Sequence, residues 1–78
     1  MQVHVRYFAV LRERAGVDDS AVEVERGTTV GEMYLSLFPP GEEGVMPVLF
    51  AVNQQYVSKD HQLMPGDEVA FIPPLGGG

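Results

Sequence analysis

The clearest helical pattern in this chain lies near its middle, between segments that have the pattern of strands. Thr29 and Glu32 have the spacing of a capping box, in which each side chain binds the backbone amide of the other residue. Apolar residues with helical spacing follow, at Val30, Met33, Tyr34, Leu37 and Phe38. Pro39-Pro40 prevents the helix from continuing. A helix with one apolar face has to bury that face, here against a sheet.

Alternation of apolar and polar residues predicts the strands. It is clearest at the start, where Val3, Val5 and Tyr7 are expected to face the core and Phe8 the opposite side. The predicted strands cover residues 3–7, 21–24, 48–52, 56–57 and 68–72. A short helix is expected over 10–15, with Gly16 as its left-handed cap. Residues 41–44, 53–55 and 65–67 read as loops or turns, with Asp67-Glu68 in solvent. The sequence thus predicts an α+β fold: about five strands with one main helix on one face.

Length and cysteine content limit how such a chain is stabilised. The chain has 78 residues and no cysteine, so disulfides and thiolate metal sites are excluded and packing alone must hold the fold. We expect one domain over residues 1–74 and a flexible tail over 75–78. The start of the chain lacks a signal-peptide pattern, and no apolar run could cross a membrane. The expected location is the cytoplasm, without membrane association.

The charge of the chain argues against binding of nucleic acid. The formal net charge is −6, and the five cations are spread along the chain as Arg6, Arg12, Arg14, Arg26 and Lys59. Binding to phosphates needs a cluster of cations, which this sequence lacks. The acidic balance suits solubility or, alternatively, approach to a basic partner surface.

The residues that could do chemistry are too few for an independent enzyme. The phosphate-binding loop of nucleotide-binding proteins is absent, and Lys59 is followed by Asp60. His4 and His61 do not make a zinc site without cysteine. Ser58, Asp60 and His61 are close neighbours that cannot easily form a catalytic triad, and Asp60 is expected to cap its turn. The sequence therefore predicts no metal site, no bound cofactor and no catalytic activity of the chain on its own.

The end of the chain is the remaining candidate for chemistry. It reads Pro73-Pro74-Leu75-Gly76-Gly77-Gly78, in which two prolines end sheet pairing and glycine leaves the terminal carboxyl open to attack. A carboxylate is a poor electrophile, so another protein would have to activate it, most simply as an acyl-adenylate. A thiol or persulfide could then convert it to a thiocarboxylate.

Several segments resemble one known family. They are Val5-Arg6-Tyr7-Phe8-Ala9, Ala51-Val52-Asn53-Gln54, and the ending Gly66-Asp67-Glu68-Val69-Ala70-Phe71 with Pro73-Pro74 and Gly77-Gly78. In order and at matching length, they resemble the small subunits of molybdopterin synthase, also called molybdopterin-converting factor subunit 1. Such proteins are sulfur carriers, and the resemblance implies a ubiquitin-like β-grasp fold.

The resemblance also implies a role for the tail and for a contact patch. A ubiquitin-activating-like adenylyltransferase would adenylate Gly78 with ATP and magnesium, and a sulfurtransferase would supply the sulfur of a thiocarboxylate. The tail, with Gly77 as its slim approach, would enter the large synthase subunit. The sulfur would there pass to cyclic pyranopterin monophosphate in molybdenum cofactor biosynthesis. The implied partner-binding residues are Phe8, Leu63, Ile72, Pro73, Pro74 and Leu75.

Three other functions stay open at this point. A sulfur carrier for thiamine thiazole or amino-acid biosynthesis would use the same chemistry with another acceptor. A ubiquitin-like modifier would instead join Gly78 to lysines of target proteins. A plain binding module would have an inert tail and would survive deletion of Gly77-Gly78.

Overall fold

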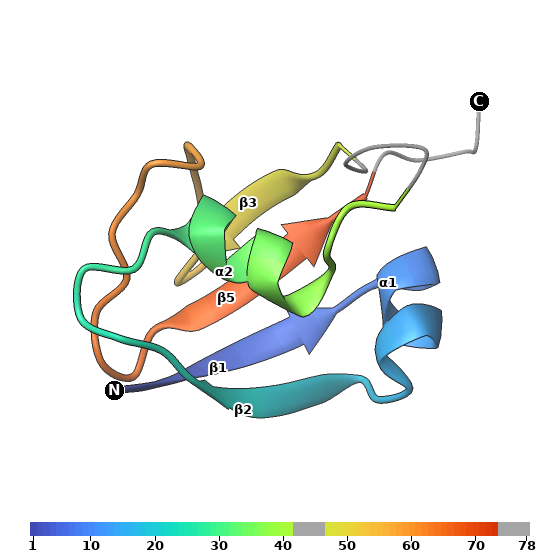
Figure 1. Ribbon diagram of the computed structural model, residues 1–78, viewed down its shortest axis with the longest axis horizontal. Helices are drawn as coiled ribbons and strands as arrows, with labels where there is room; N and C mark the ends of the chain where they lie inside the picture. Colours follow the sequence, from blue (N-terminus) through green and yellow to red (C-terminus); the bar gives the residue numbers. More distant parts are fainter. Residues whose placement is uncertain (42–46, 74–78) are drawn as a thin grey trace.

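A five-stranded sheet with a helix across one face forms the body of the protein (Figure 1). The computed structural model describes residues 1–41 and 47–73. Its elements, in chain order, are β1 (Gln2–Tyr7), α1 (Ala9–Ala15), β2 (Asp19–Glu23), α2 (Val30–Leu37), β3 (Leu49–Val52), β4 (Gln55–Val57) and β5 (Glu68–Ile72). The predicted α+β order of strands and main helix is confirmed.

The sheet is mixed, and its first and last strands lie side by side. The strand order is β2-β1-β5-β3-β4. β1 pairs with β5 in parallel, with Tyr7 opposite Phe71, whereas every other neighbouring pair is antiparallel. A parallel pair needs a long crossover connection, and here the whole chain between β1 and β5 provides it.

The beginning of α2 is held by side chains and by a distant loop. Thr29 Oγ1 accepts from the Glu32 amide at 3.2 Å, and Glu32 Oε1 accepts from the Thr29 amide at 2.9 Å, so the predicted capping box is confirmed. The next two free amides of the helix, those of Val30 and Gly31, donate to the carbonyl oxygens of His61 and Lys59 at 2.9 and 3.0 Å. The amides at the first turn of a helix lack intrahelical partners, and here they find tertiary ones.

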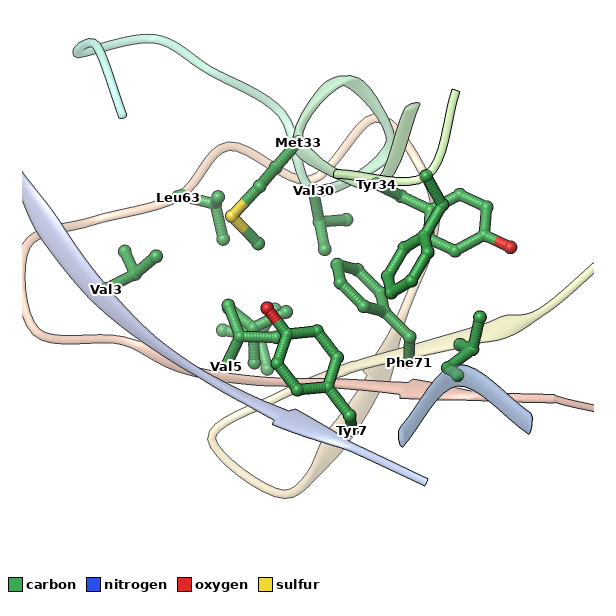
Figure 2. Close-up of a cluster of buried hydrophobic side chains, with 12 residues drawn as sticks. Val3, Val5, Tyr7, Val30, Met33, Tyr34, Leu63 and Phe71 are labelled. Atoms are coloured by element: carbon green, nitrogen blue, oxygen red, sulfur yellow. The ribbon is translucent and has the colours of Figure 1, made fainter. Parts of the chain in front are cut away.

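The core lies between α2 and the face of the sheet that it covers (Figure 2). Val3, Val5 and Tyr7 of β1 point into it, as the alternation predicts, and β5 adds Val69 and Phe71. Its buried members are Val3, Val5, Tyr7, Leu11, Val30, Met33, Tyr34, Phe38, Val52, Leu63, Val69 and Phe71. Rings from three strands and the helix segment meet here, with the centroids of Tyr34 and Phe71 5.0 Å apart. The other face of the sheet carries no part of α2 (Figure 1); we call it the open face.

The turn before β5 is not the solvated acidic turn that its sequence predicts. Asp67 is buried, with 8% of its surface exposed. Its carboxylate accepts from the Met64 amide at 2.8 Å and from Asn53 Nδ2 at 3.0 Å. The side-chain oxygen of Asn53, Oδ1, in turn accepts from the Glu68 amide at 3.0 Å. The expectation for Asp67 was wrong because its partner Asn53 lies in the β3–β4 turn, which only the folded sheet brings close.

Candidate protein-docking site

A hollow of about 240 Å³ lies on the open face, beside the end of β5. Side chains of β1, β5 and the β3–β4 hairpin line it, because residues paired directly across strands point to the same face. Its lining consists of Arg6, Phe8, Ala51, Gln54, Tyr56, Glu68, Ala70 and Ile72. Apolar groups form most of the floor, whereas Arg6 and Glu68 add one charge of each sign. We call this set the open-face hollow.

Phe8 reaches the hollow because it continues the extended backbone of β1, with φ −125° and ψ 148°, and so points away from the core-facing Tyr7. Phe8 is the N-cap of α1, and the next residue, Ala9, has a φ of 51°. This left-handed conformation is uncommon for a residue other than glycine. The Phe8 side chain is 38% exposed, and the Arg6 guanidinium carbon lies 5.7 Å from the centre of its ring. A cation at this distance from an aromatic ring is attracted to its face, and part of the Phe8 ring remains exposed.

Ile72 extends the apolar surface to the point where β5 ends. It is half-buried and pairs with Leu49 of β3, which is 59% exposed. Both side chains point to the open face, because Phe50 and Phe71, their neighbours in sequence, meet edge to face on the core side with ring centroids 5.9 Å apart. The structure thus brings Phe8 and Ile72 to one hollow, as the sequence predicts; their role in binding stays a prediction.

Two other predicted contact residues are not available on this surface. Leu63 is 2% exposed and packs in the core, where its amide donates to the Thr28 carbonyl oxygen at 2.9 Å. Pro73 is buried as well. Burial leaves little of either side chain exposed in this conformation, and their role in partner binding stays a prediction. Leu63 sits in the irregular segment after β4, which has no periodicity that could reveal its direction.

Sequence reasoning missed two exposed apolar residues on this face. Tyr56 is 72% exposed and lines the hollow, and Leu49 lies next to Ile72. The alternation of residues along β3 could have revealed Leu49, because it places Leu49 and Ala51 on the face of the sheet away from the core-facing Phe50.

The remaining predicted site residues lie outside the part of the chain that the structure describes. They are Pro74, Leu75, Gly77 and Gly78, together with the boundary between domain and tail. The loop predicted over 41–44 is likewise described only at Gly41.

The lining of the open-face hollow is mainly apolar, with one cation and one anion. Within residues 1–41 and 47–73 no three His, Cys, Asp or Glu side chains could share a metal ion. None of the helices described is long and apolar enough to cross a membrane. Apolar groups with one cation and one anion at the rim are suited to binding a protein surface.

Comparison with known proteins gives a consistent result over the whole length. The profile of the ThiS family matches residues 5–78. The molybdopterin synthase sulfur carrier subunit of Chlamydomonas reinhardtii is 41% identical, and the match covers all of both chains.

Two solved structures show the same fold. One is a putative molybdopterin converting factor, subunit 1, from Pyrococcus furiosus, with a TM-score of 0.78 and 32% identity over 96% of this chain and 99% of that chain. The other is small archaeal modifier protein 1 of Haloferax volcanii, with a TM-score of 0.80 and 25% identity over 95% of this chain and 98% of that chain. The expected ubiquitin-like β-grasp fold is thereby confirmed.

Proposed function

This chain belongs to the ThiS family, and from its full-length similarity to molybdopterin synthase sulfur carrier subunits we propose that it carries sulfur for molybdopterin synthesis. The family expected from the sequence is confirmed. As in those relatives, the chain acts as the small, non-catalytic subunit of the synthase. The observation that carries the proposal is this full-length match in a chain whose open-face hollow ends at Ile72, shortly before the terminal glycines.

The proposed chemistry takes place at Gly78. A carboxylate oxygen attacks the α-phosphorus of ATP, held with magnesium by a ubiquitin-activating-like adenylyltransferase, and pyrophosphate leaves. The persulfide of a sulfurtransferase then attacks the carbonyl carbon and AMP leaves. A thiol cleaves the resulting disulfide bond and releases the thiocarboxylate of Gly78, the thiol being oxidised to a disulfide. Gly77 adds no side chain, so both enzymes can reach the carbonyl.

The sulfur then passes to cyclic pyranopterin monophosphate in the large synthase subunit. Because the dithiolene product contains two sulfur atoms and each chain carries one, two loaded chains are used per product. Phe8 and Ile72 dock the body of the carrier on that subunit, and Pro74 and Leu75 guide the tail. We place the reaction in the cytoplasm, where ATP is available. A chain without cysteine, which needs no disulfide, fits this reducing compartment.

Mass spectrometry of the intact chain tests this function. After incubation with the activating enzyme, Mg²⁺-ATP and a sulfur source, we expect a fraction whose mass has changed by replacement of one oxygen with sulfur. The change should map to the C-terminal peptide. A chain that ends in an amide at Gly78 should not acquire sulfur and should not support dithiolene synthesis. If that amide variant is active, the proposal is wrong.

A second candidate function follows from the likeness to small archaeal modifier protein 1. In that case Gly78 would be joined to lysines of other proteins, and the adducts would resist reducing agents. A sulfur carrier that serves thiazole synthesis is distinguished differently, because it should co-purify with a thiazole synthase and not with a large molybdopterin synthase subunit.

A further inference from the structure

A groove of about 390 Å³ lies beside α2, on the face of the sheet that this helix covers. Its walls come from α2 and from the segment that leads into β3. The apolar part of the lining consists of Tyr34, Leu35, Pro47, Val48 and Phe50. Leu35 is 43% exposed although it belongs to the helix that covers the core. We call this surface the helix-side groove.

The strand pairing places the end of β5 next to this groove. β4 and β5 both pair antiparallel with β3, so they run in the same direction and leave the sheet at the same end. The chain enters β3 at that end, through Pro47 and Val48. Leu49 pairs with Ile72. When this register is continued by one residue, Val48, a wall of the groove, lies beside Pro73.

The direction of the side chains favours the groove over the open face. Phe71 points into the core, and Ile72 lines the open-face hollow. Alternate residues of an extended chain share a face. Pro73 therefore follows Phe71 to the helix side, and its burial shows that the chain still lies against the body after β5 has ended. An extended continuation takes Leu75 to the same side.

The length of the segment beyond Pro73 limits the surfaces that it can reach. Residues 74–78 span at most about 17 Å when fully extended, and Leu75 lies within about 7 Å of Pro73. Neighbouring strands are about 4.8 Å apart. Leu75 can therefore reach the Val48 wall of the groove but not β2, which lies two strands away from β5.

Apolar contact, and not charge, would hold this segment in the groove. Pro74 and Leu75 are apolar, whereas the three glycines after them have no side chain. The charged lining residues are Glu32, Lys59 and Asp60, an excess of one negative charge. This rim gives the terminal carboxylate no net attraction. Removal of the Leu75 side chain from water against the apolar walls supplies the favourable free energy.

We infer that the helix-side groove binds the chain's own C-terminal segment, with the Leu75 side chain between Leu35 and Val48. The segment exchanges between this docked state and a free state. An enzyme that takes Gly78 into a narrow channel has to capture the free state, so docking lowers its apparent affinity in proportion to the fraction of chains that is free. This consequence rests on the proposed activation of Gly78, whereas the docking itself does not.

NMR spectroscopy of the whole wild-type chain tests the docking. We expect nuclear Overhauser effects between the methyl groups of Leu75 and those of Leu35 and Val48. Leu75→Asn in the full chain should shift the amide signals of Leu35 and Val48 and should leave that of Tyr56, on the open face, unchanged. If Leu75 contacts neither groove residue, the inference is wrong. Contacts between labelled and unlabelled chains in a mixture would identify a second copy as the occupant and would also overturn it.

The rate of adenylation tests the consequence of docking. Leu35→Asn changes an exposed wall of the groove and should raise kcat/KM of the activating enzyme for the chain, with Mg²⁺-ATP, about twofold to tenfold. Met64→Asn is the matched control and should leave this rate unchanged. Met64 is also an exposed apolar residue, but it precedes β5 and so lies toward the other end of that strand.

The direction of the rate change separates the possible occupants of the groove. A lower rate for Leu35→Asn would show that the groove docks the enzyme, and would overturn the inference. An unchanged rate would show that docking does not compete with activation, and would overturn that consequence. If the wild-type chain is not adenylated at all, the carrier function fails, and the contacts of Leu75 in the NMR spectra still decide the docking.

Discussion

At the scale of single residues, tertiary contacts reverse what local preference suggests for Gly31. Alanine in the interior of a helix is favoured over glycine by about 1 kcal/mol. Here, however, an added Cβ would lie 2.9 Å from both the Cβ and the carbonyl oxygen of Lys59. The second of these atoms belongs to the backbone and accepts the Gly31 amide, so it cannot move away without loss of that bond.

Gly31→Ala is therefore expected to lower the free energy of unfolding by about 1–3 kcal/mol, the usual range for overpacking. Urea denaturation followed by circular dichroism measures the change. Ser36→Ala in the same helix is the control, because Ser36 is exposed and alanine should leave stability equal or slightly higher. A Gly31→Ala protein more stable than the wild type would contradict the contact.

Asp67 is the second residue whose part in the structure depends on distant neighbours. Asp67→Ala should lower the free energy of unfolding by about 1–3 kcal/mol, because the Met64 amide and Asn53 Nδ2 both lose their acceptor. Asp60→Ala is the matched control, since Asp60 is exposed and should cost little. Equal effects of the two substitutions in urea denaturation would show that the Asp67 network adds no stability.

At the scale of elements, the capping box links the stability of α2 to pH. Hydrogen bonds from the Thr29 backbone amide and hydroxyl lower the pKa of Glu32 below the ordinary glutamate value of 4.5. A carboxyl group with a lowered pKa in the folded state stabilises the fold above its unfolded pKa. That contribution is lost as the pH falls through the folded value.

Glu32→Gln should therefore be less stable than the wild type near neutral pH, and the difference should shrink as the pH is lowered below 4.5. Urea denaturation at a series of pH values measures it. Thr29→Ala removes the hydroxyl that donates to Glu32 Oε1 and accepts from the Glu32 amide, and it should cost about 1 kcal/mol. A difference between wild type and Glu32→Gln that grows in acid would contradict the assignment.

Elements with strong local signals were predictable from the sequence. β5 has the bounds 68–72 that its alternation predicts, and α2 starts after its Thr29 cap. The pairing of β1 with β5 was not predictable, because alternation tells which face a residue occupies and not which strand lies beside it. The same limit explains Leu63, whose burial comes from the contact between the segment after β4 and the start of α2.

At the scale of the whole molecule, the two faces of the sheet carry different sets of residues. The face covered by α2 holds the core, whereas the open face carries Phe8 and Ile72 beside the end of β5. Substitutions on the core face should therefore change the free energy of unfolding, whereas substitutions on the open face should change binding to a partner protein. The candidate site was predicted in part, since Phe8 and Ile72 meet but Leu63 lies on the opposite side.

Phe8→Ala should weaken co-purification with a large synthase subunit and change the free energy of unfolding by less than about 0.5 kcal/mol. Leu63→Ala should show the opposite pattern, with a loss of about 2–5 kcal/mol in stability as for other buried leucines. At a temperature where both variants are folded, Leu63→Ala should bind the partner normally. A binding defect confined to Leu63→Ala would refute this division.

The parallel pairing of β1 with β5 also bears on synthesis of the protein. β5 is the central strand, flanked by β1 and β3, and Val69 and Phe71 are fully buried in it. A nascent polypeptide cannot close this core until residue 72 has left the ribosome, since long-range pairing needs both strands. Chains that stop before residue 72 consequently lack a folded body. Proteases that degrade unfolded chains can remove them before an activating enzyme acts on their C-termini.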